Sequence, residues 1–339
     1  MENSTLHNNA IDLLKSLIST PSFSGEEAQT AKIIASWLTK NGVEINRHKN
    51  NVWATNKYFD QNKPTVLLNS HHDTVKPNKA YTNNPFESKI ENGKLYGIGS
   101  NDAGGCLVSL MSTFVHFYSQ KDLKYNLVLA ATAEEENSGP NGLNNLQKIL
   151  PEITFAVIGE PTEMQISVSE KGLLVIDAFA SGIAGHAAHE NTENAIYNAM
   201  QDIDWIRNYT FPKTSPTLGN VKMSVTQINA GEQHNVVPAN CHFVIDVRTN
   251  EYYTNQEIFE IFDANTKSEL KARSFHLNSS SISLDHPIVQ AGISLGKKTY
   301  GSPTLSDQAV LTCPSLKLGP GVSARSHSCL LYTSPSPRD

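Results

Sequence analysis

The sequence predicts an α/β protein with a mixed, mostly parallel sheet flanked by helices and a ferredoxin-like βαββαβ domain inserted into it. Three observations carry this prediction. Continuous apolar runs at residues 66–68, 127–131 and 156–158 suit strands that are covered on both faces. Amphipathic helical patterns alternate with these runs, as in α/β folds. From about residue 171 the order of predicted elements becomes β-α-β-β-α-β, which is the order of a ferredoxin-like module.

The composition describes a globular protein and argues against several functional classes. The 339 residues are 39% hydrophobic and 18% charged, with a formal net charge of −6 and no basic cluster that would bind nucleic acid. No apolar run approaches the roughly 18 residues of a membrane span, and residues 1–9 lack the apolar core of a signal peptide. We therefore expect a cytoplasmic protein that binds neither nucleic acid nor a membrane. The four cysteines (Cys106, Cys241, Cys313 and Cys329) lack CxxC spacing, so histidines and carboxylates would have to hold any metal.

Residues 6–41 are predicted to form two amphipathic helices. The first ends at the Thr20-Pro21 step, because the residue before a proline is disfavoured in a helix. The second has Ser24 as its expected N-cap and Gly42 as its stop. The other elements expected in this half are strands at 52–57, 65–68, 127–131 and 156–158 and a helix at 107–117.

The inserted domain is predicted to cover residues 171–281. A helix at 284–298 returns to the pattern of the first domain, which therefore consists of residues 1–170 and 282–327. Residues 328–339 contain two Ser-Pro steps and no helical pattern, so we expect a non-native tail in place of a terminal helix, with a disordered native tail as the alternative. The elements expected in the inserted domain are strands at 173–180, 221–228, 241–247 and 272–277 and helices at 194–209 and 255–265.

The stretch around His71 is the first candidate site. Successive side chains of a strand alternate, so His71 and Asp73 share one face and His72 lies on the other. In open α/β sheets the functional residues lie just past the carboxyl ends of strands. A histidine followed two residues later by a carboxylate suits a zinc ligand beside an orienting group. A His-rich turn without a metal is the alternative.

Carboxylates follow the next two buried runs as well. Glu134, Glu135 and Glu136 come after the second run, and Glu160 comes after the third. Consecutive glutamates at the end of a buried strand cost free energy unless a cation compensates their charge. Asp102 precedes an apolar helix among several glycines, where a simple helix N-cap is the alternative role. The repetition at one sheet edge favours a metal site over a solvated run of charge.

These residues belong to a longer series of motifs. The series resembles that of the co-catalytic zinc amidohydrolases, a zinc-exopeptidase-like group that includes acetylornithine deacetylase, succinyl-diaminopimelate desuccinylase, aminoacylase and the glutamate carboxypeptidases. The resemblance covers about residues 6–327, and its specificity comes from the fixed order of the motifs. The motifs are His71-x-Asp73, Asp102 with Gly104-Gly105, Glu135-Glu136, Gly159-Glu160-Pro161-Thr162, Gly185-His186, Asn235-Val236-Val237-Pro238, Asp246-Val247-Arg248, and Gly319-Pro320-Gly321 with His327.

The resemblance implies two zinc ions, with cobalt as a possible substitute. Asp102 would be the carboxylate that bridges the two ions. His71 and Glu160 would complete the ligands of one ion, and Glu136 and His327 those of the other. Such ions lower the pKa of water and polarise an amide carbonyl.

The resemblance also implies the acid–base residues of the first domain. Asp73 would orient His71, and Glu135 would be the general base that takes a proton from water and delivers it to the leaving amine. In an alternative register, Glu134 would be the base and Glu135 the metal ligand.

The inserted domain would be a lid and dimerisation domain on the same resemblance. His186 would reach the active site of the partner subunit in a homodimer and donate a hydrogen bond to the tetrahedral oxyanion. Asn235 would help to hold the substrate, and Arg248 would clamp its α-carboxylate in a bidentate pair. A surface ion pair is the alternative for Arg248, and His189 and His234 would be exposed loop residues.

The predicted activity is hydrolysis of the amide bond of an N-acyl-L-amino acid, a small-molecule substrate. The motifs most resemble those of the acetylornithine or acetylcitrulline deacetylase branch, which implies arginine biosynthesis. Succinyl-diaminopimelate desuccinylation and a dipeptidase activity are the alternatives. A non-catalytic amino-acid-binding homologue is the alternative from another class, although every ligand and the base are present in the sequence.

Overall fold

A computed structural model describes residues 3–77, 81, 83–326 and 332–333 of the chain. These residues divide into two compact units. Unit 1 comprises Met1–Val168, Ile282–Tyr300 and Ser306–Asp339, and unit 2 comprises Ser169–Ser281 and Gly301–Leu305. Among the described residues, none of the helices is both long and apolar enough to cross a membrane.

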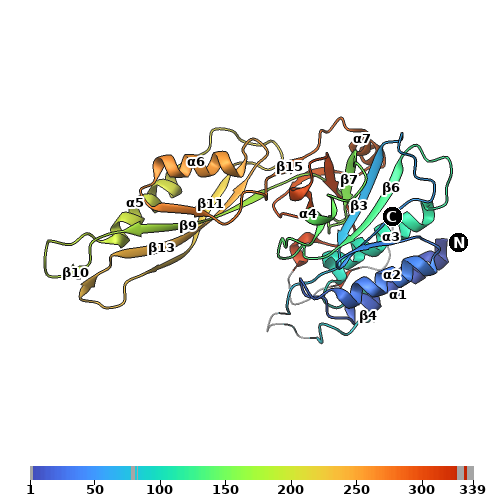
Figure 1. Cartoon of the computed structure of the whole chain (residues 1–339), viewed down its shortest axis with the longest axis horizontal. Coiled ribbons are helices and arrows are strands. Elements are labelled where there is room, and N and C mark those ends of the chain that lie inside the picture. The colour runs from blue at the N-terminus through green and yellow to red at the C-terminus, as the bar shows by residue number, and fades with distance from the viewer. Residues whose placement is uncertain (1–2, 78–80, 82, 327–331, 334–339) are drawn as a thin grey trace. The chain divides into compact units, whose positions relative to one another are not determined.

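Unit 1 is built on a mixed sheet (Figure 1). Strand β3 lies between β6 and β7 and is parallel to both, and β17 is parallel to β7, whereas β1, β2 and β8 pair in antiparallel fashion. The order along the sheet is β1 (Asn46–His48), β2 (Asn51–Thr55), β6 (Asn126–Thr132), β3 (Thr65–His71), β7 (Phe155–Ile158), β17 (Ser315–Lys317) and β8 (Ile166–Glu170), with β16 (Thr299–Ser302) pairing with β8 off this path.

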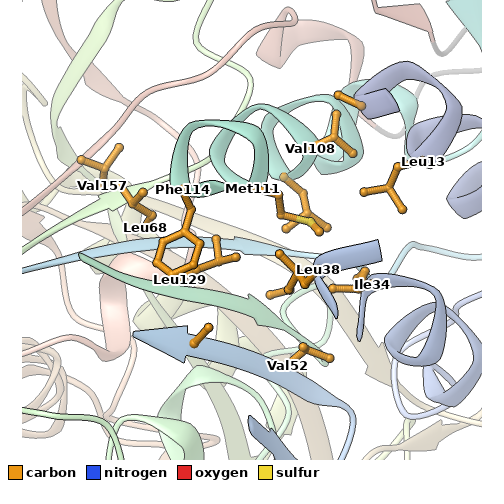
Figure 2. Close-up of a cluster of buried hydrophobic side chains, with 14 of the residues drawn as sticks. Leu13, Ile34, Leu38, Val52, Leu68, Val108, Met111, Phe114, Leu129 and Val157 are labelled. Atoms are coloured by element: carbon orange, nitrogen blue, oxygen red, sulfur yellow. The ribbon is translucent and has the colours of Figure 1, made fainter. Parts of the chain in front are cut away.

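The central strands of this sheet are buried on both faces, as the continuous apolar runs require. Alternate residues enter two different hydrophobic clusters: Leu68, Leu129 and Val157 lie in one, and Leu67 and Val128 in the other. In Figure 2 the first cluster lies between the strands and the helices, with labelled side chains from both. The labelled residues are Leu13, Ile34, Leu38, Val52, Leu68, Val108, Met111, Phe114, Leu129 and Val157.

Helices cover both faces of the unit 1 sheet. One face carries α1 (Asn3–Ile18), α2 (Ala28–Lys40), α3 (Gly105–Phe117) and α7 (Pro287–Ser294), which all contribute residues to the first cluster. The other face carries α4 (Leu143–Leu146) and a 3-10 turn, η2 (Asp307–Val310). The remaining elements are the turns η1 (Ser100–Gly104) and η3 (Ser323–Arg325) and a small sheet of β4 (Lys89–Glu91), β5 (Lys94–Tyr96) and β18 (Tyr332–Thr333).

Unit 2 has the predicted ferredoxin-like order, with an antiparallel sheet in the spatial order β11-β13-β9-β14. Its two helices pack on the hydrophobic cluster of this sheet. The elements are β9 (Gly172–Ser181), α5 (Ala195–Asn208), β11 (Lys222–Ala230), β13 (Asn240–Thr249), α6 (Asn255–Asn265) and β14 (Glu269–Ala272). Two short pairings lie outside this sheet. Strand β10 (Gly185–His186) pairs with β12 (Val236–Val237), and Ser280 of β15 (Ser280–Ser281) pairs with Glu170.

The predicted fold class is therefore confirmed, but three local predictions are wrong. The last strand of unit 2 is β14 at Glu269–Ala272 instead of residues 272–277, because Phe275 leaves the strand to pack edge-on against Phe259 at 5.4 Å. The helix expected at 284–298 is only α7, which ends where Gly296 takes a positive φ of 77°.

Ser24 is not a helix cap, which is the third correction. Helix α2 begins at Ala28, and the Ser24 hydroxyl donates instead to the carboxylate of Asp73 at 2.6 Å. The tail predicted at residues 328–339 lies outside the described residues apart from β18, whose Tyr332 pairs with Tyr96.

Candidate metal centre and active site

Three neighbouring parallel strands deliver the candidate residues of unit 1 to one edge of the sheet. His71 is the last residue of β3, Glu135 and Glu136 follow the end of β6, and Glu160 follows the end of β7. Asp102 lies in η1, directly before α3, and its peptide bond to Ala103 is cis. The carboxyl ends of parallel strands thus collect side chains that are far apart in the sequence.

The side chain of His71 lies at the centre of this group. Its Nε2 is 3.3 Å from Asp102 Oδ1, 3.8 Å from Glu160 Oε1 and 3.9 Å from Glu135 Oε2. Ligand atoms of His71, Asp102 and Glu136 all lie within 4.8 Å of one another, which is close enough for one ion to contact the three. Four carboxylates and one imidazole nitrogen therefore converge on a small volume.

The other imidazole nitrogen of His71 faces Asp73. His71 Nδ1 lies 3.0 Å from the backbone carbonyl oxygen and 3.3 Å from the carboxylate oxygen of Asp73. With the Nδ1 proton donated to Asp73, Nε2 is free to act as a ligand. Burial lowers the pKa of His71, but the charge of Glu135 and the hydrogen bonds to Asp102 and Asp73 raise it more, so the net shift is upward.

Asp73 also holds the backbone of the glutamate turn, which is formed by Glu134, Glu135 and Glu136. Its Oδ1 accepts the backbone N–H of Glu135 and its Oδ2 that of Glu136, each at 3.1 Å. Burial raises the pKa of Asp73, yet the hydrogen bonds from His71 and Ser24 outweigh this and lower the pKa to about 2. Asp73 is therefore ionised at neutral pH, and one carboxylate orients both the histidine and the turn.

The side chain of Glu134 points away from this group. Its Oε2 accepts the backbone N–H of Asn141 at 3.0 Å, and its Oε1 accepts the side-chain amide of Asn141 at 2.8 Å. Glu134 itself has a positive φ of 57°. The turn thereby directs Glu134 into its own loop, whereas Glu135 lies beside His71.

The crowding of carboxylates raises their pKa values. Burial and the nearby charge of Asp102 raise the pKa of Glu160 to about 8, and burial raises that of Glu135 well above its usual range. Burial likewise raises the pKa of Asp307, which accepts a 2.9 Å hydrogen bond from Thr132, to about 6. With a pKa of about 8, Glu160 retains its proton at neutral pH unless a cation replaces the proton. A set of one imidazole and several carboxylate oxygens fits zinc or a similar divalent ion.

Two of the candidate residues of unit 2 are neighbours. His186 in β10 pairs with Val236 in the antiparallel strand β12, and the N–H of Ala187 donates to the carbonyl oxygen of Asn235 at 2.9 Å. His186 and Asn235 therefore lie on the same exposed pair of antiparallel strands. The backbone N–H of Ala188 donates to His186 Nδ1 at 3.1 Å. This hydrogen bond requires an unprotonated Nδ1, which leaves the proton on Nε2 as a donor.

Arg248 is already engaged within unit 2. Its Nε donates to Asp246 Oδ1 at 2.8 Å and its Nη2 donates to Oδ2 at 3.1 Å, which makes a bidentate pair on one face of β13. The two residues are both half-buried. His327, the remaining predicted ligand, lies outside the described residues.

Two functional candidates were not identified from the sequence. Asp307 lies among serines and threonines, and no apolar strand directly precedes it. Glu27 directly precedes α2, where an acidic residue is normally exposed, yet its carboxylate is fully buried and accepts the N–H of Glu134. No periodicity marks either residue, so only their burial beside the site identifies them.

Comparison with known proteins identifies relatives over most of the chain. A sequence profile of the peptidase family M20/M25/M40 matches residues 67–328. The succinyl-diaminopimelate desuccinylase of Wigglesworthia glossinidia brevipalpis is 29% identical over an alignment of 271 positions, gaps included, that covers 74% of this chain and 71% of the relative. The acetylornithine deacetylase of Proteus mirabilis is also 29% identical, over an alignment of 359 positions, gaps included, that covers 94% of this chain and 90% of the relative.

Solved structures share the fold at low sequence identity. A tripeptidase from Staphylococcus aureus aligns over 97% of this chain and 94% of its own, with a TM-score of 0.77 and 17% identity. The YXEP protein of Bacillus subtilis, described as a dinuclear metal-binding peptidase, aligns over 94% of this chain and 90% of its own, with a TM-score of 0.71 and 19% identity. The fold of the chain is therefore one already known from solved peptidase structures.

Proposed function

Because this chain belongs to peptidase family M20/M25/M40 and is a hydrolase of amide bonds, we propose that it removes the acyl group from an N-acyl-L-amino acid. The single observation that carries this proposal is the convergence of four carboxylates on the side chain of His71: those of Asp102, Glu135, Glu136 and Glu160. A site with this donor set suits water activation and amide cleavage.

The first substrates we propose are N-acetylornithine and N-acetylcitrulline, which implies a step of arginine biosynthesis. Support comes from the Proteus mirabilis acetylornithine deacetylase, since its similarity extends over 94% of this chain. N-succinyl-diaminopimelate is the second candidate. It is favoured by the desuccinylases of Wigglesworthia glossinidia brevipalpis and Beijerinckia indica, at 29% and 26% identity over 74% of this chain.

We further propose two bound zinc ions, for which cobalt would substitute. Asp102 would bridge them, His71 and Glu160 would hold one, and Glu136 with His327 would hold the other. Support for this assignment comes from the convergent donors and from the Bacillus subtilis relative described as dinuclear. When bound, the ions would supply Lewis-acid polarisation of the amide carbonyl and a lowered pKa for water.

Proton transfer and the positioning of the reacting groups are assigned to different residues in this proposal. Glu135 accepts a proton from the attacking water and delivers it to the departing amine, a role favoured by its position beside His71 Nε2. Asp73 orients His71 and fixes the backbone of Glu135, as its hydrogen bonds support. Glu134 is unsuited to the role of base, because its carboxylate is occupied by Asn141.

Unit 2 contributes substrate contacts in this proposal. His186 donates its Nε2 proton to the oxyanion that develops in the transition state, and the Ala188 N–H that fixes its tautomer supports this role. Asn235 holds the substrate beside it. Arg248 binds the α-carboxylate, for which it would exchange its bidentate partner Asp246 for an equivalent carboxylate.

We propose a homodimer in which His186 acts in the active site of the partner subunit. Strand β11 lies at the edge of the unit 2 sheet, and its last five residues are exposed. Ile228 on this strand and Tyr197 and Met200 on α5 are more than half exposed, at 51%, 64% and 55%. An edge strand flanked by exposed apolar side chains suits pairing with a second copy.

The free thiols of Cys106 and Cys241 support a cytoplasmic location.

The test is amine release from N-acetylornithine, N-acetylcitrulline and N-succinyl-diaminopimelate, with zinc added and then removed by a chelator. Chelator-sensitive hydrolysis of one substrate supports the proposal and identifies the acyl group. Hydrolysis only of dipeptides would replace the deacylase by a dipeptidase. Binding of an amino acid and two metal ions without hydrolysis of any substrate would overturn the enzymatic proposal in favour of a binding protein.

A further inference from the structure

Glu27 is a buried carboxylate beneath the glutamate turn that the proposed mechanism does not use. It is the residue immediately before α2, and none of its surface is exposed. Its Oε1 accepts the backbone N–H of Gly25 at 2.5 Å and that of Glu134 at 3.2 Å. Its Oε2 accepts the side-chain amide of Asn50 at 2.8 Å. Three donors from three separate segments thus meet on one side chain.

Glu27 and Asp73 together hold three consecutive backbone amides. The N–H of Glu134 donates to Glu27, and those of Glu135 and Glu136 donate to the two oxygens of Asp73. The two carboxylates come from the segments before α2 and after β3. Every peptide N–H at the start of the glutamate turn is therefore fixed by a buried acceptor outside the turn.

The segment before α2 connects these two acceptors. Ser24, three residues before Glu27, donates its hydroxyl to Asp73 Oδ2 at 2.6 Å. The same segment is anchored to the end of β3, because the N–H of Thr74 donates to the carbonyl oxygen of Ser22 at 2.9 Å. One short stretch of chain thus supports both the loop after β3 and the loop after β6.

The glutamate turn needs such external support. Glu134 has a positive φ of 57°, a backbone conformation that costs free energy for a residue with a side chain. It follows directly on Ala133, whose N–H is held by Asn51 Oδ1 at 2.9 Å. A turn in this conformation relaxes when its hydrogen bonds are lost, and Glu135 and Glu136 follow it in the chain. Displacements of about 1 Å at a reacting group cost on the order of 100-fold in rate.

We propose that Glu27 is a positioning residue that holds the N–H of Glu134 and thereby directs Glu135 and Glu136 toward His71 and Asp102. The inference rests on the proposed function in assigning the catalytic consequence to Glu135. In this proposal the side chain at position 27 must be long enough for its acceptor oxygen to contact the N–H of Glu134. The negative charge of Glu27 is not required.

Two substitutions at position 27 distinguish the effect of side-chain length from the effect of its negative charge. Glu27→Gln retains the length and one acceptor oxygen without the charge, and the Asn50 amide can turn to accept from the new NH2 group. Glu27→Asp retains the charge but is one methylene shorter. The matched controls are Glu26→Gln and Glu26→Asp, the same changes at the adjacent exposed residue. If Glu27→Asp does not fold, Glu27→Met replaces it, because methionine retains the length without a carboxylate.

Two readouts are measured on the metal-loaded full chain. Kinetics give kcat and KM on the best substrate, and hydrogen exchange gives the protection of the Glu134 amide, which does not depend on activity. We expect Glu27→Asp to lower kcat about 100-fold with a KM near that of the parent, and to speed exchange at Glu134. Glu27→Gln should remain within about tenfold of the parent in kcat, with Glu134 still protected.

Opposite results overturn the inference. If Glu27→Asp retains full kcat and a protected Glu134 amide, position 27 does not hold the turn. If Glu27→Gln is more impaired than Glu27→Asp, the charge of Glu27 matters and not its reach. If the parent hydrolyses none of the substrates, the proposed function fails, while exchange at Glu134 in the same variants still decides the role of Glu27.

Discussion

The carboxylate of Glu134 accepts two hydrogen bonds from Asn141, one from its backbone N–H at 3.0 Å and one from its side-chain amide at 2.8 Å. Both oxygens of Glu134 are thus occupied inside its own loop. Its neighbour Glu135 has Oε2 at 3.9 Å from His71 Nε2. Two adjacent glutamates with the same side chain therefore have different surroundings, and the difference can be tested by the same substitution at each.

Glu135→Gln should abolish most of the hydrolysis, whereas Glu134→Gln should not. Removing a general base costs about 10²–10⁴-fold in kcat, and glutamine at position 135 retains the shape of the side chain. At position 134 an amide loses one of the two hydrogen bonds to Asn141, which affects stability by roughly 1 kcal/mol rather than chemistry. Steady-state kinetics and metal analysis of both variants provide the measurement. A larger loss at position 134 than at 135 would favour the alternative register.

Mixing two inactive variants should restore activity if His186 acts in the partner subunit. A Glu135→Gln chain retains His186, and a His186→Ala chain retains Glu135, so each mixed dimer has one complete site. Random exchange of subunits should recover about a quarter of the parent activity, since half of the dimers are mixed and each has one of two sites intact. Activity is measured after mixing and re-equilibration. Recovery no greater than the sum of the separate variants would place His186 in its own subunit.

Chelating the metal should make stability depend on pH in a characteristic direction. Without metal, the pKa of Glu160 is raised to about 8 from its usual 4.5, so the folded state holds a proton that the unfolded state releases. This contribution to stability is complete below pH 4.5 and is lost as pH rises toward 8, by at most about 1.4 kcal/mol per pH unit. Melting temperatures of the chelated protein should fall from pH 6 to pH 8, and added zinc should raise them most at pH 8. Identical pH profiles with and without chelator would contradict the assignment of Glu160 as a ligand.

His72 should destabilise the protein in acid. Burial lowers its pKa from 6.5 to about 4, and its two nitrogens contact the Thr30 hydroxyl at 2.9 Å and the Asn50 carbonyl oxygen at 3.1 Å. The folded state excludes a proton that the unfolded state binds, so stability is complete above pH 6.5 and decreases as pH falls toward 4. Between pH 6.5 and 5 the loss is about 2 kcal/mol.

The control for this prediction is His72→Gln, whose amide can still donate to the Asn50 carbonyl oxygen but does not titrate. Denaturant unfolding of the metal-loaded parent and the variant at pH 7, 6 and 5 gives the comparison. The parent should lose stability relative to the variant as the pH falls. A difference between the two that stays constant with pH would show that His72 does not change its charge on unfolding.

The arrangement around His71 was predictable because a strand imposes a period of two residues. Alternation places His71 and Asp73 on one side and His72 on the other, where the structure shows His72 against Thr30 and Asn50. Continuous apolar runs likewise predicted that β3, β6 and β7 are buried on both faces. Local chain geometry was sufficient for these features.

The role of Glu27 was not predictable, because its burial depends on distant segments. An acidic residue beside a helix start is normally exposed and favourable to the helix dipole. Here Asn50 and the backbone of Glu134 contact Glu27. Neither contact produces a periodic pattern in the sequence from which it could be predicted. Strand β8 was missed for a similar reason: alternating serines in Ile166–Glu170 do not resemble a buried strand until β17 lies beside it.

The position of β17 has a consequence for how the chain is made. This strand fills the place between β7 and β8 in the unit 1 sheet, yet it is synthesised after all of unit 2. The strands of the unit 2 sheet, in contrast, lie within one continuous stretch from β9 to β14 and need no later residue to pair. During translation the inserted unit can therefore fold while the surrounding sheet still has a vacant position, so unit 1 is the last part of the protein to be completed.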